Sequence, residues 1–479
     1  MKLLILGIDA MDPDVIFNNL NKLPNIKNLV SKGCYGDYDA YAYGYGSSDN
    51  WISLYTGLTP KQHGIIGNIL RVYDRTPRRE DYADKKPFWE LLNKKGVTVG
   101  LWKGLNTTPT RKIDGYMIGG EPNYEIDNQN DPLGSAKPLF CEEDKKLKEY
   151  ISGNIENPPM PRKAQDFGFS WDELLENPDL INQILTDDYF EECVDYLKKE
   201  LNYYKDNIIN MQEHRPVDLL FFYTAIIDFL AHFQMHAPKK RVIIEAYKVV
   251  DNFIGEMIEK LNPNNIIVMS DHGIKALADF FPNTSTKIQK ESFGWRDKSI
   301  WLENGQIITK ARNKGIMSGI HAIKGSFIAT GEDIKPSKLE EMRTIDFYPT
   351  LLELFDIKVP KGREGYVLDI FKDKEIINKE KLLTKDKIKR ENIAIIQDME
   401  VSEFNRVINE VFLDHRFAKI TIFGEEKYKN IFSGNPRIDD FIIVDDFELD
   451  FKELEEYDKV FISYRNRMTD QFSYISISK

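Results

Sequence analysis

The strongest constraint on the fold is a series of short apolar runs, each of which stops at a polar residue. The runs KLLILGI, DLLFFYTA and NIIVMS start at Lys2, Asp218 and Asn265, and amphipathic helical patterns follow the first two. Continuous apolar runs of this length are typical of strands buried on both faces of a parallel sheet, with helices as the covering layers. The sequence therefore predicts an α/β fold with a mostly parallel sheet between helices.

Residues with metal-binding side chains follow these runs. A strand-ending Asp is usually a turn residue, and an Asp-x-x-x-His pair is common by chance, so each has a structural explanation when taken singly. Ligands of open α/β sheets, however, bind at the carboxyl ends of the strands. Three carboxylates and three imidazoles together are the ligand set of a two-metal site for displacement at phosphorus. The residues are Asp9, Asp228, His232, Asp271, His272 and, in GIHAIKGSFIATG before a further strand, His321.

Two adjacent serines in GSSDNWISLYTGLTPKQHG, residues 46–64, are candidates for a nucleophile. Ser47 or Ser48, followed by Asp49, would also make an ordinary N-cap for the apolar helix that comes next. An activated serine needs a base or a metal, which this stretch does not contain. The stretch alone leaves both interpretations open.

The order of the motifs resembles the type I phosphodiesterase and nucleotide pyrophosphatase branch of the alkaline phosphatase superfamily. The family's motifs have counterparts in GIDAMD, SSDNWISLYTGLTPKQHGI, DFLAH, SDHG, HAIKGSFIATG and DFYPTLLELFDIKVPKGREGYVL. The resemblance is specific because it depends on several motifs in order. It implies an alkaline-phosphatase-like fold for the part of the chain that contains these motifs.

The resemblance also implies a role for each candidate residue. The family's nucleophile lies nine residues before the Thr of Thr-Gly, which is Thr56 here, so it selects Ser47 and leaves Ser48 to a capping role. Two divalent ions are implied, with zinc favoured by the mixture of His and Asp and manganese as the second candidate. One ion would be held by Asp228, His232 and His321, and the other by Asp9, Ser47, Asp271 and His272.

Three further positions bear on the substrate. The nucleophile of this branch is usually Thr, whereas Ser is common in phosphomonoesterases, and Asp49 would either bind the helix N-terminus or repel a phosphate. Asn68, 21 residues after Ser47, occupies the place of an Asn that binds a phosphate oxygen in nucleotide pyrophosphatases. A neutral amide there suits a diester, although a turn Asn is the alternative. His63 is not a metal ligand in the family and is expected to make a structural hydrogen bond.

These observations predict a metal-dependent hydrolase of phosphodiester or pyrophosphate bonds in a nucleotide or nucleotide-sugar type of substrate, acting through a covalent Ser47 intermediate. The alternatives are a phosphomonoesterase of the same superfamily and a non-catalytic binding or scaffolding protein that retains the fold. A sulfatase is excluded, because neither CYGDY nor SSDNW supplies the Cys/Ser-x-Pro-x-Arg that its nucleophile requires.

The chain is expected to form two domains. Residues 1–375 would form the phosphodiesterase domain, with 106–216 and 274–319 as insertions that cap the site. After a charged linker, strands in IAIIQ, KITIFG, DFIIVDD and KVFISYR alternate with helical patterns. Residues 390–479 would therefore form a small Rossmann-like α/β accessory domain, whose partner the sequence does not identify.

Composition narrows the range of partners. The formal net charge of −12 disfavours a nucleic acid or an anionic membrane as partner, whereas the small phosphate ester that the resemblance implies can still bind through metals. No apolar run reaches the roughly 20 residues of a spanning helix. The cysteines Cys34, Cys141 and Cys193 lie far apart, so no disulfide framework is indicated and a cytoplasmic location is expected.

Overall fold

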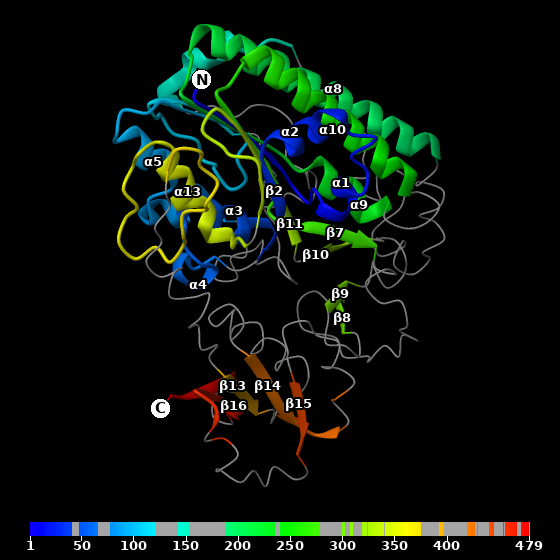
Figure 1. The fold of residues 1–479 in the computed structure, drawn as a ribbon, viewed down its shortest axis with the longest axis vertical. Helices are drawn as coiled ribbons and strands as arrows, with labels where there is room; N and C mark the ends of the chain where they lie inside the picture. Colours follow the sequence, from blue (N-terminus) through cyan, green and yellow to red (C-terminus); the bar gives the residue numbers. More distant parts are fainter. Residues whose placement is uncertain are drawn as a thin grey trace. The chain divides into compact units, whose positions relative to one another are not determined.

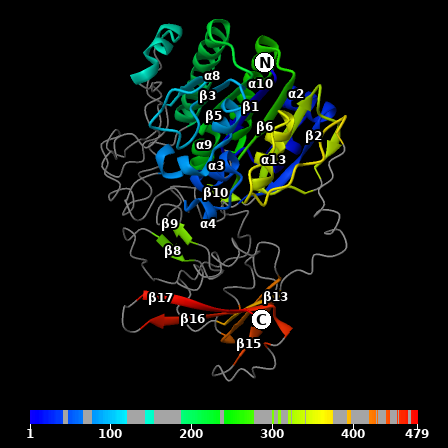
Figure 2. The same ribbon diagram turned by 90° about the vertical axis from the view of Figure 1, so that its left-hand side faces the viewer.

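A computed structural model describes most of the chain, and its described parts form two compact units. The units comprise residues 1–280 with 315–376, and residues 281–314 with 377–479. Figures 1 and 2 show their elements as ribbons. The described residues are 1–40, 47–65, 77–119, 142–153, 187–234, 240–276, 299–301, 307–309, 319–322, 324–339, 341–374, 392–396, 419–426, 429, 440–444, 454, 456–466 and 471–478.

The first unit is built on an eight-stranded sheet in the order β12-β2-β11-β6-β1-β5-β3-β4. The five strands from β6 to β4 are parallel to one another, and β11 is antiparallel to both of its neighbours. This arrangement confirms the predicted mostly parallel sheet. The strands are β1 (Leu3–Ile8), β2 (Cys34–Asp39), β3 (Val99–Trp102), β4 (Gly115–Ile118), β5 (Leu219–Thr224), β6 (Asn265–Met269), β11 (Lys324–Gly331) and β12 (Ser337–Lys338).

Helices lie on both sides of this sheet (Figure 1). On one side α10 packs against α2 and α8, and on the other α13 packs against α3 and α5. Leu3 and Ile5 of the central strand share a buried cluster with Trp51 and Tyr55 of α3, as expected from the alternation of side chains along a strand. The helices are α1 (Pro13–Phe17), α2 (Pro24–Lys32), α3 (Ser47–Thr56), α4 (Pro60–His63), α5 (Phe88–Asn93), α8 (Asp187–His214), α9 (Ile226–Gln234), α10 (Lys240–Leu261) and α13 (Phe347–Leu354), with 3-10 segments at Arg79–Lys85, Glu142–Tyr150 and Thr344–Asp346.

The amphipathic helical pattern that follows the first apolar run forms two helices, not one. Asp12 caps α1, accepting the backbone N–H groups of Asp14 at 2.9 Å and Val15 at 3.4 Å. Pro24 then occupies the first turn of α2. Proline has no N–H for an internal helical hydrogen bond, so it starts a second helix instead of continuing the first.

Both ends of the insertion expected at residues 106–216 belong to the main sheet and its helix layers. Its residues Gly115–Ile118 form the edge strand β4, parallel to β3, and α8 packs along α10. A strand of four residues is too short to show a periodic pattern, which explains why the sequence did not reveal it. Gly115 has a φ of +115°, and a Cβ there would lie 2.2 Å from the Val99 carbonyl oxygen, so the strand begins where glycine is required.

The second expected insertion, 274–319, is bounded by a two-stranded ribbon. The strand β7 (Gly273–Ala276) pairs antiparallel with β10 (Gly319–Ala322). Between them, β8 (Ser299–Trp301) and β9 (Ile307–Thr309) form an antiparallel pair that belongs to the second unit.

The C-terminal part of the second unit is a five-stranded sheet in the order β15-β14-β13-β16-β17. The four predicted strands are present and parallel, and an unexpected fifth, β17, runs antiparallel to β16. The helix patterns predicted between them lie largely outside the described residues. Among the helices that the structure describes, none has both the length and the apolar character needed to span a bilayer. The strands are β13 (Asn392–Ile396), β14 (Lys419–Gly424), β15 (Asp440–Ile443), β16 (Lys459–Asn466) and β17 (Gln471–Ser478).

Candidate active site

The carboxyl ends of three neighbouring parallel strands bring five of the predicted residues together. The register pairs Gly7 of β1 with both Met269 of β6 and Tyr223 of β5, so these strands end at the same edge of the sheet. Loops and a helix then begin there, and they carry the polar side chains. The residues are Asp9 after β1, Asp271 and His272 after β6, and Asp228 and His232 on α9, which follows β5.

His321 reaches the same place through the β7–β10 ribbon. As expected, it lies just before a strand, which is β11, and it is itself part of β10, opposite Ile274 of β7. Because β7 starts at Gly273, directly after His272, the pairing carries His321 back to that residue. The two imidazole rings stack, with centroids 3.9 Å apart and planes 27° from parallel.

The first cluster, here called the buried triad, consists of Asp9, Asp271 and His272, whose candidate ligand atoms lie within 4.8 Å of one another. His272 Nε2 is 3.5 Å from Asp9 Oδ1 and 3.3 Å from Asp271 Oδ2. His272 Nδ1 lies 3.0 Å from the Gly273 carbonyl oxygen, which can only accept, so Nδ1 carries a proton. In the neutral imidazole Nε2 then presents a lone pair to the carboxylates, as in metal-binding histidines oriented by a backbone carbonyl.

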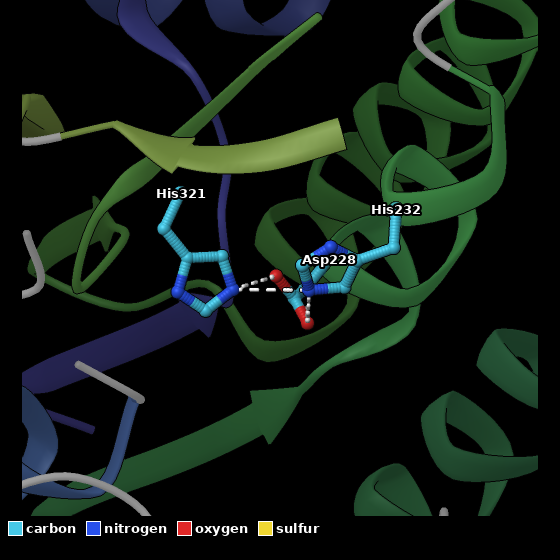
Figure 3. Close-up of side chains that lie close together, drawn as sticks. All are labelled: Asp228, His232 and His321. Carbon is cyan, nitrogen blue, oxygen red and sulfur yellow. Dashed lines mark hydrogen bonds and ion pairs between the residues drawn. The ribbon is translucent and has the colours of Figure 1, made fainter. Parts of the chain in front are cut away.

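The second cluster, here called the outer triad, consists of Asp228, His232 and His321, and its candidate ligand atoms also lie within 4.8 Å of one another. Figure 3 shows both imidazoles pointing at the carboxylate, one from α9 and one from β10. The two Nε2 atoms are 3.0 Å apart, and they lie 3.4 Å (His232) and 3.1 Å (His321) from Asp228 oxygens. Two imidazole nitrogens directed at each other and at one carboxylate form a typical arrangement for a bound cation.

The pKa shifts of the three carboxylates also bear on whether the triads hold cations. Burial raises the pKa of Asp271 well above its usual range, and the charges of Asp9 and Asp228 raise it further. The pKa of Asp9 is also raised, mainly by burial and secondly by the charge of Asp228. Burial acts to raise the pKa of Asp228 as well, but the charges of His232 and His321 outweigh it and hold that pKa well below the ordinary value.

Two buried carboxylate oxygens test whether a cation fits. Asp271 Oδ2 and Asp228 Oδ1 each have a histidine Nε2 beside them, at 3.3 Å (His272) and 3.1 Å (His321), but neither oxygen accepts a hydrogen bond of good geometry among the described residues. A buried carboxylate oxygen without a donor is costly unless a positive charge lies beside it. The two clusters together supply the mixed His and Asp donors that suit zinc, so the residues fit a pair of divalent cations.

Ser47 stands beside the buried triad as the first residue of α3. Its Oγ donates to Asp9 Oδ1 at 3.3 Å and lies 3.1 Å from His272 Nε2. The hydroxyl is therefore placed where a cation held by the triad could contact it, which is the position implied for a nucleophile.

Asp49 is turned away from solvent. Its side chain is fully buried, and Oδ1 accepts the backbone N–H of Asn50 at 3.1 Å. Of the two roles considered from the sequence, contact with the N-terminal turn of the helix is the one the geometry favours.

His63 makes the structural hydrogen bonds expected of it. Nδ1 accepts the backbone N–H of Ile65 at 3.1 Å, which leaves Nε2 to donate to Ser53 Oγ at 3.0 Å. Burial lowers the pKa of His63 to about 3, so the ring is neutral. Asn68, the predicted phosphate-binding amide, lies outside the described residues.

Two residues that touch Asp9 were not singled out from the sequence. Trp51 Nε1 donates to Asp9 Oδ2 at 3.1 Å, and the hydroxyl of Tyr223 donates to the same oxygen at 2.7 Å. The available signals were weak: Trp51 lies four residues after Ser47 on one helix face, and Tyr223 lies near the end of a strand.

Known proteins with similar sequences are nucleotide hydrolases by name. The bis(5'-adenosyl)-triphosphatase ENPP4 of Pongo abelii is 23% identical over 180 residues, which cover 33% of this chain and 39% of the relative. The human protein of the same name gives the same identity and coverage. The chain thus matches about two fifths of the length of these curated relatives.

Solved structures and a family model complete the comparison. Murine ectonucleotide pyrophosphatase/phosphodiesterase 5 is 14% identical with a TM-score of 0.44, covering 78% of this chain and 100% of that one. The human protein is 14% identical with a TM-score of 0.43, covering 76% and 97%. The model of the family described as type I phosphodiesterase / nucleotide pyrophosphatase matches residues 3–467. The chain belongs to the type I phosphodiesterase/nucleotide pyrophosphatase family.

Proposed function

We propose that the protein is a metal-dependent hydrolase of phosphodiester or pyrophosphate bonds, with Ser47 as its nucleophile. The observation that carries this proposal is the convergence of two triads of metal-binding side chains beside one serine hydroxyl. Family membership and the names of the matching relatives support a nucleotide as the substrate class. A nucleotide sugar is the second candidate substrate.

In this proposal each side chain has a defined task. Ser47 Oγ gives up its proton and attacks phosphorus, and the bond to the leaving oxygen breaks. Water then hydrolyses the ester between Ser47 and the retained part of the substrate, which restores the serine hydroxyl. Asp9 and His272 orient the hydroxyl through the contacts already described. Two divalent cations, zinc or manganese, would supply the positive charge that favours the ionised hydroxyl and neutralises the phosphoryl oxygens. Asn68 is proposed to donate a hydrogen bond to one of those oxygens.

The other predicted functions make different demands. A phosphomonoesterase is the nearest alternative, because a serine nucleophile is common there. A scaffolding protein would gain nothing from three carboxylates gathered in these two triads, where their charges repel one another without a cation. A cytoplasmic location stays a proposal, supported by the buried Cys34, which is present as a thiol, and the C-terminal sheet is proposed to be an accessory domain.

A substrate panel with two serine variants tests the function. The protein, loaded with zinc or manganese, is assayed on an aryl phosphodiester, an aryl phosphomonoester, a dinucleoside polyphosphate and a nucleotide sugar. We expect the diester and the pyrophosphate-containing substrates to be preferred. Ser47→Ala should reduce kcat/KM at least about a thousandfold, whereas Ser48→Ala, the matched control, should change it less than about threefold.

The outcomes separate the three functions. Preference for the monoester would identify a phosphomonoesterase. Equal losses in the two serine variants would contradict the assignment of the nucleophile. Absence of turnover on the whole panel with either metal would favour the binding protein.

A further inference from the structure

The two oxygens of the Asp9 carboxylate have different partners. Oδ1 faces the site, 3.3 Å from Ser47 Oγ and 3.5 Å from His272 Nε2. Oδ2 faces the protein interior and accepts two hydrogen bonds, from the Tyr223 hydroxyl at 2.7 Å and from Trp51 Nε1 at 3.1 Å. A carboxylate oxygen that accepts two donors has used its principal lone-pair directions, so Oδ1 is the oxygen left for a cation.

Helix α3 holds both oxygens at once. Ser47 and Trp51 are four residues apart, so they lie on the same face of the helix, one turn from each other. The first residue contacts Oδ1 and the second contacts Oδ2. The helix that presents the proposed nucleophile therefore also sets the rotation of the carboxylate beside it.

The two donors are held by tight packing. Trp51 is fully buried and Tyr223 is 2% exposed, and their rings meet edge to face with centroids 5.2 Å apart. The indole lies over Gly7, where a Cβ would come within 2.6 Å of Trp51 Cη2. Gly7 is the register partner of Tyr223 across β1 and β5, so one glycine makes room for the whole arrangement.

Burial of the indole does not by itself require the hydrogen bond to Asp9. The buried Nε1 atoms of Trp89 and Trp102 have no hydrogen-bond partner among the described residues. Within the described part of the chain, buried indoles therefore occur whose N–H has no protein partner. The double donation to a single oxygen of Asp9 is a particular feature of the site and calls for an explanation there.

We propose that Trp51 and Tyr223 are positioning residues that hold the Asp9 carboxylate for binding of a divalent cation through Oδ1 alone, beside Ser47 Oγ. Release of Oδ2 would let the carboxylate rotate and bind the cation with both oxygens, which would disturb the contact of Oδ1 with Ser47. The inference deepens the proposed function and rests on it in one respect, namely that the buried triad holds a cation.

Metal titration of the full-length protein tests the proposal without an activity assay. Metal-free protein is titrated with zinc, and separately with manganese, in the presence of a competing chelator, and two binding steps are expected for the wild type. Tyr223→Phe and Trp51→Phe should each weaken binding of the buried-triad ion about 10- to 100-fold. This is the range for residues that orient a metal ligand. The ion of the outer triad should stay within about threefold of its wild-type affinity. Tyr223→Phe removes only the hydroxyl, so it remains informative even where Trp51→Phe does not fold.

Two matched variants control for the loss of a buried ring or hydroxyl. Tyr116→Phe deletes a buried hydroxyl of β4 that accepts from Gln212 Nε2 at 2.7 Å. Trp102→Phe shrinks a buried indole whose Nε1 has no hydrogen-bond partner among the described residues. Both controls should bind the two ions within about threefold of wild type, even where their melting temperatures fall.

Each result decides a different point. Unchanged affinities in both test variants would overturn the positioning role and leave the proposed function standing. Equal weakening of both ions, or equal effects in the controls, would mean general structural damage and would also overturn it. Failure of the wild type to bind either metal would remove the proposed function, and the positioning role with it.

Discussion

The buried triad and the outer triad use the same kinds of side chain in opposite proportions. The buried triad has two carboxylates and one imidazole, and its side chains are 0 to 1% exposed. The outer triad has one carboxylate and two imidazoles, and its side chains are 13 to 18% exposed. Ser47 contacts the buried triad. Under the proposed function, the buried triad would prepare Ser47, and the more exposed outer triad would be the more accessible of the two to a substrate.

Electrostatics sharpens this contrast. In the buried triad, burial and the neighbouring carboxylates raise the pKa of Asp9 and Asp271. In the outer triad the imidazoles lower the pKa of Asp228 despite its burial, and burial together with the charge of His272 lowers the pKa of His321 to about 3. The buried triad therefore depends more on a cation for its stability than the outer triad does.

Chelation should give the largest effect and should show which ion leaves first. We expect a strong chelator to reduce turnover at least about a thousandfold, because charge stabilisation at phosphorus is lost. Ion release, followed with a coloured chelator in a stopped-flow instrument, should be biphasic, with the more exposed outer triad emptying first. His321→Asn should abolish the fast phase and keep the slow one. Release in a single phase, or persistence of the fast phase in His321→Asn, would break the comparison.

In the metal-free protein, the two triads should change the free energy of unfolding in opposite directions as pH changes. The folded-state pKa of Asp271 is raised above the ordinary 3.8, so its ionised form increasingly destabilises the native state as pH rises above that value. Asp271→Asn should therefore raise the melting temperature at pH 8 and have little effect near pH 4. The folded-state pKa of His321 is lowered from 6.5 to about 3, so protonation favours the unfolded state as pH falls through that window. His321→Asn should stabilise the protein near pH 4.5 and not at pH 8.

Thermal melts in chelator across this pH range measure both effects. Each kcal/mol corresponds to a change in melting temperature on the order of 2 to 4 °C for a domain of this kind. The same pH trend in both variants would show that the charge difference between the triads is not what controls their stability.

A substitution at one glycine should give the smallest effect and should alter metal binding at only one triad. Gly7→Ala would place a Cβ within 2.6 Å of Trp51 Cη2, and we expect it to cost about 1–3 kcal/mol in the free energy of unfolding. It should weaken the ion of the buried triad and not that of the outer triad. Gly36→Ala is the matched control, because its Cβ would lie 2.7 Å from Cβ of Leu339, which directly follows β12 of the same sheet. Denaturant unfolding and metal titration of both variants would show the difference, and weakened metal binding by the control would contradict it.

The centre of the main sheet could be predicted because its strands β1, β5 and β6 are continuous apolar runs. All residues of β1, β5 and β6 are buried, and such strands contrast sharply with their surroundings in the sequence. Among the strands that escaped prediction are β4 and β17. The first is too short for a pattern, and the second follows the last strand of the expected alternation of strands and helices, as an antiparallel addition to an otherwise parallel sheet.

The sequence by itself determined which side chains are available for the site. Asp9, Asp271 and His272 come directly after apolar runs, and Asp228 and His232 are one helical turn apart, so local pattern was sufficient to select them. The resemblance to the family then distinguished Ser47 from Ser48.

Only the tertiary structure decided how these side chains meet. His321 lies 89 residues from His232 in the chain, and the antiparallel pairing of β10 with β7 brings their Nε2 atoms to 3.0 Å. The donors to Asp9 Oδ2 come from a helix and from a neighbouring strand. Local periodicity encodes which face of an element is buried, but strand order and register set the distances between elements, and these depend on packing of the whole sheet.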